Sequence, residues 1–192
     1  RRIVQSALSA KRRTDFGVGE RQEKFSGTIR VSEKHRFDEK ALQDYLEEHV
    51  EGFSGRLVVS EFKGGQSNPT YRLQAGGTFY VLRRKPPGKL LPSAHAVDRE
   101  YRVMTALGET DVPVPRTYCL CIDENVIGTW FFIMECLDGR VLWEATLPDL
   151  EKSERFAIYD TMNETLAKLH AVDWQAIGLD TFGKPGNSFA RQ

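Results

Sequence analysis

A short run of small and polar residues between two predicted strands has the composition of an anion-binding loop. Gly64 and Gly65 carry no side chain that would hold the backbone away from an anion, and Ser67 and Asn68 add short donors. Successive N–H groups in such a turn can form a concave nest for phosphate oxygens. The run therefore indicates a phosphate site in the stretch from Glu61 to Arg84.

Two arginines end the third strand that follows this loop. Arg83 and Arg84 are adjacent, so their side chains point to opposite faces of a sheet. A permanent cation beside a glycine-rich loop can grip the same phosphates with two donors. A loop with such a cation beside it has the parts of a kinase-type nucleotide site.

Short strands with tight turns surround the loop and predict an antiparallel meander, which is not the strand–loop–helix unit of a P-loop. Gly76-Gly77 suits a two-residue hairpin. Past the meander, two more apolar runs predict strands. The five predicted strands are residues 57–62, 70–75, 78–83, 117–122 and 129–136.

Three helices follow from apolar spacing and capping residues. The first has Asp38 as N-cap and ends before Gly52, and the second has Ser93 as N-cap and ends at Gly108. His95 would lie in the first turn of the second helix, in a capping or solvent role. The third helix is expected from about Lys152 to Ala171.

Composition narrows the class of protein. The 192 residues carry 27 basic and 27 acidic side chains, which argues against a general nucleic-acid binder. No apolar run approaches the length that spans a bilayer. Three cysteines are no disulfide scaffold, and the Cys119/Cys121 pair is expected to be buried, so a reducing, cytoplasmic compartment fits best. The basic residues near the N-terminus leave organelle targeting open.

Four motifs in this order resemble the aminoglycoside phosphotransferase (APH)/choline-kinase-like family, and most of all the kinase domain that is also fused to some acyl-CoA dehydrogenases. The resemblance implies an α+β, protein-kinase-like fold, with a five-stranded antiparallel N-lobe, one packed helix and the beginning of a helical C-lobe. The motifs are residues 62–72, 80–102, 132–139 and 166–173.

The resemblance also implies roles for single residues. The loop over the ATP phosphates would be Gly64, Gly65, Gln66, Ser67 and Asn68. Arg83 falls where protein kinases carry the strand-three lysine, and Glu100 would be the helix acid that orients it. Arg84 points to the other face of the sheet and is expected to be solvated. The alternative for this pair is two exposed surface charges, worth at most about 1 kcal/mol.

Adenine would lie between the hinge and one strand of the N-lobe. The resemblance makes Glu135, Cys136 and Leu137 the hinge, whose backbone groups meet the base, and Val81 the cover of one face of the ring. The alternative for all four is an ordinary core strand, which sequence alone barely separates from the hinge.

No catalytic or metal-binding residue is expected in this chain. The end of the long helix, His170 to Asp173, lacks the His-x-Asp spacing of the family's catalytic loop, and Asp180-Thr-Phe-Gly183 has one residue too many for the Asp-Phe-Gly metal site. The cofactors implied are ATP and Mg²⁺, with the metal ligands outside this chain. The chain is therefore expected to be a fragment of a longer kinase or a chain whose remainder is not represented.

The predicted organisation is an N-terminal extension (1–25), expected to be flexible, a kinase-like N-lobe (26–139) and an incomplete C-lobe (140–192). The implied function is ATP-dependent phosphorylation of a small-molecule hydroxyl, with a hydroxyacyl-CoA or related metabolite favoured over an aminoglycoside. The alternative is a non-catalytic nucleotide-binding or interaction module. Neither nucleic acid nor membrane is an expected partner, and a homo-oligomer is allowed.

Overall fold

The computed structural model describes residues 26–63, 68–86, 88, 95–142 and 144–183 of the chain. Within these ranges six strands form one sheet in the order β1-β2-β3-β4-β6-β5, and every neighbouring pair is antiparallel. The strands are β1 (Thr28–Ile29), β2 (Val58–Phe62), β3 (Thr70–Ala75), β4 (Thr78–Arg84), β5 (Thr117–Cys121) and β6 (Phe131–Glu135).

The prediction of an α+β fold with an antiparallel sheet is confirmed, but the strand count of five was one too low. The missed strand, β1, has only two residues, which pair with Phe62 and Glu61 of β2. Two residues are too few to show an alternating pattern of apolar and polar side chains, so sequence periodicity could not reveal this edge strand.

The β3–β4 hairpin sets which residues face each other across the centre of the sheet. Gly76 and Gly77 have φ values of 54° and 83°, as a two-residue hairpin with positive φ at both central positions requires. Ala75 therefore pairs with Thr78, and counting back along both strands places Thr70 opposite Arg83. The two-glycine turn thus places the hydroxyl of Thr70 beside Arg83, the predicted phosphate-binding cation.

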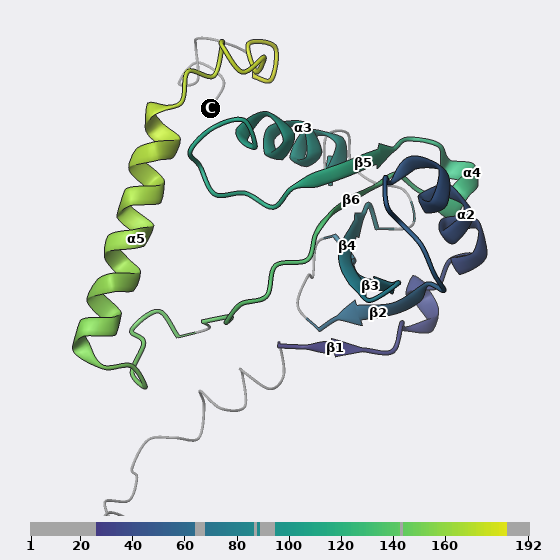
Figure 1. Ribbon diagram of the computed structural model, residues 1–192, viewed down its shortest axis with the longest axis horizontal. Helices are drawn as coiled ribbons and strands as arrows, with labels where there is room; N and C mark the ends of the chain where they lie inside the picture. The colour runs from purple at the N-terminus through teal and green to yellow at the C-terminus, as the bar shows by residue number, and fades with distance from the viewer. Residues whose placement is uncertain (1–25, 64–67, 87, 89–94, 143, 184–192) are drawn as a thin grey trace, which may run out of the picture.

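One face of the sheet forms the main core with α2 (Glu39–His49). Asp38 caps this helix by accepting from the backbone N–H groups of Lys40 and Ala41, as predicted. Leu42 and Leu46 are fully buried against the sheet. The short helix α4 (Glu124–Ile127) lies next to α2 on this side of the molecule (Figure 1). Buried sheet residues of this core are Tyr71, Leu73, Ala75, Tyr80, Leu82, Cys121, Phe131 and Ile133.

The other helix of the lobe, α3 (Val97–Leu107), contacts β5 and β6 (Figure 1). The ring of Tyr101 meets the buried ring of Phe132 with centroids 5.9 Å apart. The helix starts at Val97, whereas the prediction had Ser93 as its N-cap; Ser93 itself lies outside the described residues. His95 has φ of 57°, in the left-handed region, so the backbone is not helical there.

The last helix, α5 (Lys152–Ala171), has the predicted bounds and lies to one side of the sheet (Figure 1). Its apolar side chains are exposed: Phe156, Tyr159, Met162, Leu166 and Leu169. After α5 the chain returns to α3, where Arg102 donates to the carbonyl of Gly178 and Arg99 to that of Phe182. None of the helices in the described part has the length and apolarity to cross a membrane.

Candidate nucleotide site

Arg83 and Glu100 form an ion pair between the central strand β4 and the helix α3. The Nε of Arg83 donates to Oε2 of Glu100 at 2.5 Å, and Nη2 lies 3.4 Å from Oε1. The two side chains are 29% and 37% exposed, so the pair lies at the border between protein and solvent. A guanidinium held in this way keeps its charge and its orientation and still reaches solvent. The structure therefore brings together the two charges that the sequence had paired.

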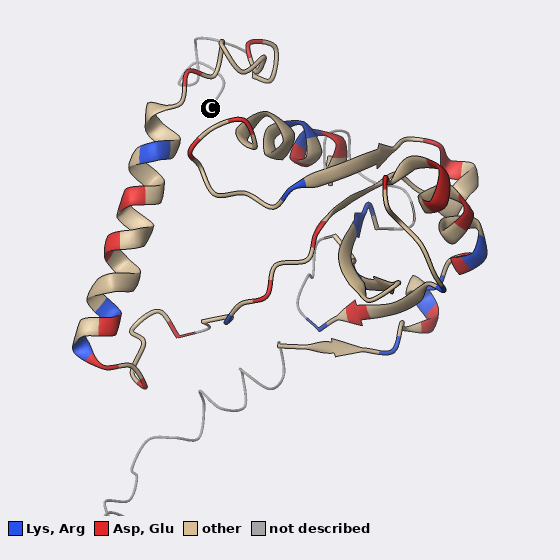
Figure 2. Ribbon diagram, viewed as in Figure 1, with Lys and Arg blue, Asp and Glu red and all other residues tan. Residues whose placement is uncertain are grey.

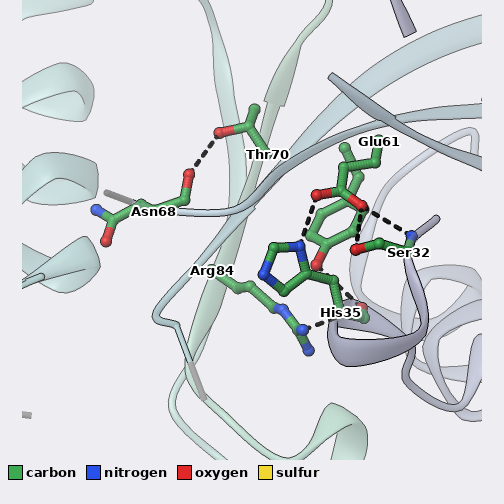
Figure 3. A network of polar contacts seen from close by, with 7 residues as sticks. Ser32, His35, Glu61, Asn68, Thr70 and Arg84 are labelled. Atoms are coloured by element: carbon green, nitrogen blue, oxygen red, sulfur yellow. Dashed lines mark hydrogen bonds and ion pairs between the residues drawn. The ribbon is translucent and has the colours of Figure 1, made fainter. Parts of the chain in front are cut away.

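Asn68 and Thr70 complete the surroundings of this pair. The Nδ2 of Asn68 donates to Oε1 of Glu100 at 3.0 Å, and Nη1 of Arg83 donates to Oγ1 of Thr70 at 3.3 Å. Thr70 in turn donates to the backbone carbonyl of Asn68 at 3.0 Å, the contact drawn in Figure 3. Sequence reasoning missed Thr70, although the hairpin register predicts it as the partner of Arg83.

His95 is a second residue whose role the sequence did not give. Its Nδ1 lies 2.8 Å from Oδ1 of Asn68. We had expected a capping or solvent role in the first turn of a helix, but His95 precedes α3 and points at the loop end. Nothing in the local sequence pattern signals this contact, because the two residues are 27 positions apart.

Val81 lies on the same face of the sheet as Arg83, two residues away along β4. It pairs across the sheet with Arg72 on one side and Met134 on the other, so these three form a row next to the Thr70–Arg83–Phe132 row. Val81 is buried without belonging to the core formed with α2. This location fits a residue that covers a ligand beside the ion pair.

The three predicted hinge residues end β6 and start the segment that leads to α5. Glu135 is tied to Arg116, since its N–H donates to the carbonyl of Arg116 at 2.8 Å and its carboxylate accepts from the Arg116 N–H. Cys136 is half-buried, and burial raises the pKa of its thiol. Leu137 is 61% exposed, and within the described residues its N–H has no hydrogen-bond acceptor.

Arg84 corrects a prediction, because it is buried and not solvated. Its exposure is 3%, and Nη2 donates to the carbonyl of His35 at 3.0 Å. The guanidinium carbon lies 5.2 Å from the ring centroid of Phe37 and 5.4 Å from that of Tyr71. The cause is the 3-10 helix η1 (Glu33–His35), which covers this face of the sheet (Figure 3). Arg84 therefore belongs to the core and cannot serve the site that Arg83 faces.

Glu61 fixes η1 to the sheet. One carboxylate oxygen accepts from both the N–H and the hydroxyl of Ser32, each at 3.0 Å, and the other lies 2.6 Å from Nδ1 of His35 (Figure 3). Burial alone would raise the pKa of Glu61, but the hydrogen bonds from Ser32 and His35 outweigh it and hold the pKa below its ordinary value. A buried carboxylate thus keeps its charge because the charge is well paired.

Several predictions fall outside the described residues. Gly64, Gly65, Gln66 and Ser67 lie outside them, so the structure places only Asn68 of the predicted phosphate loop.

Within the described residues, no three His, Cys, Asp or Glu side chains gather to hold a metal ion. His170 is exposed in the last turn of α5, and Phe182 of the Asp180–Gly183 stretch contacts Arg99. Acidic and basic residues are interspersed along α3 and α5, whereas α2 and α4 are mainly acidic (Figure 2).

A mixed sheet-and-helix lobe whose central strand carries a cation paired with a helix glutamate defines a protein-kinase-like phosphotransferase fold. The family model described as "Phosphotransferase enzyme family" (APH) matches residues 58–192. The chain belongs to this family.

Known relatives agree with this assignment. A crystal structure described as a "putative aminoglycoside phosphotransferase" from Ralstonia eutropha superposes with a TM-score of 0.71 at 54% identity, over 81% of this chain and 45% of that one. The "Probable acyl-CoA dehydrogenase" IBR3 of Arabidopsis thaliana is 48% identical over 85% of this chain, and human acyl-CoA dehydrogenase family member 11 is 44% identical over 82%. The chain spans only 21% of the length of each of these two relatives.

Proposed function

We propose that this lobe binds ATP and that the protein to which it belongs transfers the γ-phosphoryl group to a hydroxyl of a small molecule. One observation carries the proposal. Arg83 is held by Glu100 at the end of β4, next to Asn68 where the glycine-containing run ends. In kinases a cation and an acid in these positions orient the phosphates of ATP.

The remaining roles follow from the same arrangement. Gly64 to Asn68 would lie over the phosphates, Val81 would cover the adenine ring, and the backbone of residues 135–137 would meet its edge. Mg²⁺ accompanies ATP in phosphoryl transfer and neutralises charge on the phosphates. We assign none of its ligands to the described residues, where no suitable cluster occurs. In this proposal residues 26–139 are the N-lobe and 140–192 begin a helical C-lobe.

The acceptor is proposed to be a hydroxyacyl-CoA or a related hydroxy acid. The support is the set of relatives named acyl-CoA dehydrogenases, in which a stretch like this chain makes up about a fifth of the length. An aminoglycoside is less favoured, because among the described residues the acidic side chains gather on α2 and α4 (Figure 2), which pack on the face of the sheet opposite to Arg83. A cytoplasmic location and a homo-oligomeric state remain further predictions.

Thermal unfolding with and without ATP tests the binding claim. ATP at 100 times its dissociation constant should stabilise the chain by about 2.7 kcal/mol, which for a protein of this size raises Tm by about 5–10 °C. Arg83→Met should remove most of the rise, whereas Arg56→Met, at an exposed position, should not. Equal rises in both variants would refute the role of Arg83, and no rise in the wild-type chain would refute the proposal.

Catalysis and substrate need a second experiment on the full-length protein. ADP release is measured with a hydroxyacyl-CoA, choline and kanamycin as acceptors. Turnover with the hydroxyacyl-CoA alone supports the assigned class, and turnover with kanamycin alone overturns it. Binding of ATP without ADP release on any acceptor would favour the alternative, a nucleotide-binding module that performs no transfer.

A further inference from the structure

Asn68 is a buried amide whose two polar ends are both used. It is 3% exposed, its Nδ2 donates to Oε1 of Glu100, and its Oδ1 lies 2.8 Å from Nδ1 of His95. A carboxylate can only accept, so the NH₂ end of Asn68 must face Glu100. The orientation of the amide is therefore fixed by chemistry.

The same reasoning fixes the proton on His95. The carbonyl oxygen of Asn68 can only accept, so Nδ1 of His95 must carry a hydrogen and donate it. The ring reaches Asn68 from a backbone with φ of 57°, a conformation that costs energy for a residue other than glycine. A strained backbone that directs a side chain toward one buried amide indicates a functional contact.

Four residues around the site form a closed ring of hydrogen bonds. Asn68 donates to Glu100, Glu100 accepts from Arg83, Arg83 donates to Thr70, and Thr70 donates back to the carbonyl of Asn68. The ring joins β3, β4 and α3 to the residue that directly follows Gly64–Ser67 in sequence. Glu100 therefore has two partners that limit where its carboxylate can point, and Arg83 follows Glu100.

We infer that Asn68, itself oriented by His95, is a positioning residue for the phosphate-facing Arg83, and that it acts through Glu100. This inference rests on the proposed function. It adds a residue pair, Asn68 and His95, to the interaction that makes Arg83 bind phosphate. Asn68 positions Arg83, which faces the phosphates, and has no role in binding the adenine base. Its loss should therefore weaken binding of ATP but leave binding of adenosine unchanged.

Calorimetric titration of the chain with ATP and with adenosine separates these effects. Asn68→Leu keeps the approximate size of the side chain, removes the donor to Glu100 and adds no charge near the phosphates; we expect ATP affinity to fall about tenfold and adenosine affinity to stay. Asn163→Ala, at an exposed position on α5, is the control and should change neither affinity. A parallel loss for both ligands in Asn68→Leu would indicate a merely structural role and overturn the inference.

Two substitutions of His95 distinguish its hydrogen bond from its backbone strain. His95→Asn tolerates positive φ and retains a donor near the place of Nδ1, so it should keep the ratio of ATP to adenosine affinity. His95→Gly relieves the strain but lacks the donor, so it should lower that ratio. A normal ratio in His95→Gly would contradict the part assigned to the histidine.

A double-mutant comparison of Tm without nucleotide tests the inference independently of ATP binding. If the wild-type chain bound ATP no better than adenosine, the proposed function would fail. The ring still predicts that the Tm losses of Asn68→Leu and Glu100→Ala are not additive, because each variant alone removes the contact between these two side chains. Additive losses would overturn the positioning role whatever the ligand data show.

Discussion

The contact of Glu61 with η1 predicts a measurable and pH-dependent contribution to stability. Three hydrogen bonds converge on this buried carboxylate, two from Ser32 and one from His35. In Glu61→Gln the amide oxygen still accepts from Ser32, and the amide NH₂ can donate to His35 once that ring carries its proton on Nε2. The variant therefore loses the charge of the acceptor but not the bonds, a cost of about 1–2 kcal/mol.

Glu61→Leu removes all three bonds and should cost about 3–4 kcal/mol, since it also leaves the N–H of Ser32 without its acceptor. For a protein of this size these losses correspond to Tm decreases of about 4 °C for Gln and about 10 °C for Leu. Urea unfolding followed by circular dichroism at pH 7 measures both. Glu109→Gln, at an exposed position, is the matched control and should lie within about 0.5 kcal/mol of wild type.

The pH dependence follows from the lowered pKa of Glu61. A carboxyl group whose pKa is lower in the folded than in the unfolded state stabilises the fold above its ordinary value of 4.5 and loses that contribution as pH falls below it. The stability difference between wild type and Glu61→Gln should therefore be constant above about pH 5.5 and shrink below 4.5, where Glu61 takes up a proton and resembles glutamine. A difference that grows on acidification, or no difference at pH 7, would refute this reasoning.

Three further predictions concern packing, capping and thiol chemistry. Leu46→Ala in the core should cost about 2–5 kcal/mol by urea unfolding, whereas Leu166→Ala on the exposed face of α5 should cost little; equal costs would contradict the assigned core. Asp38→Ala should lower the unfolding free energy by about 1 kcal/mol through loss of the N-cap, and no loss would place the cap elsewhere. Burial raises the pKa of Cys119 to about 12, so at pH 8 peptide mapping should find alkylated Cys136 before any alkylated Cys119.

Sequence reasoning succeeded where a local pattern determines geometry. Asp38 and the apolar spacing after it correctly predicted α2 and its N-cap. The pair Gly76-Gly77 correctly predicted the β3–β4 hairpin. Arg83 and Glu100 were paired through the family resemblance, and the ion pair confirms that they meet. The nucleotide roles of these residues stay predictions.

Long-range contacts account for the failures. Arg84 was expected in solvent because the sequence of its own strand gives no information about η1. The acceptor of its hydrogen bond, the carbonyl of His35 in η1, is 49 positions away in the sequence. His95 was placed in a helix because Ser93 was taken as the N-cap, whereas α3 starts at Val97 and the backbone is left-handed at His95. Both depend on partners that only the folded chain brings close.

The way η1 and α2 cover the sheet has a practical consequence for anyone who shortens this protein. The family match begins at residue 58 and so leaves out α2, which supplies Leu42 and Leu46, and the carbonyl of His35, which Tyr71 and Arg84 share as acceptor. A truncation at that boundary would strip one whole side of the sheet and expose a buried arginine among aromatic rings. The cooperative unit therefore starts upstream of residue 58, and an excision meant to retain the lobe should begin no later than residue 26.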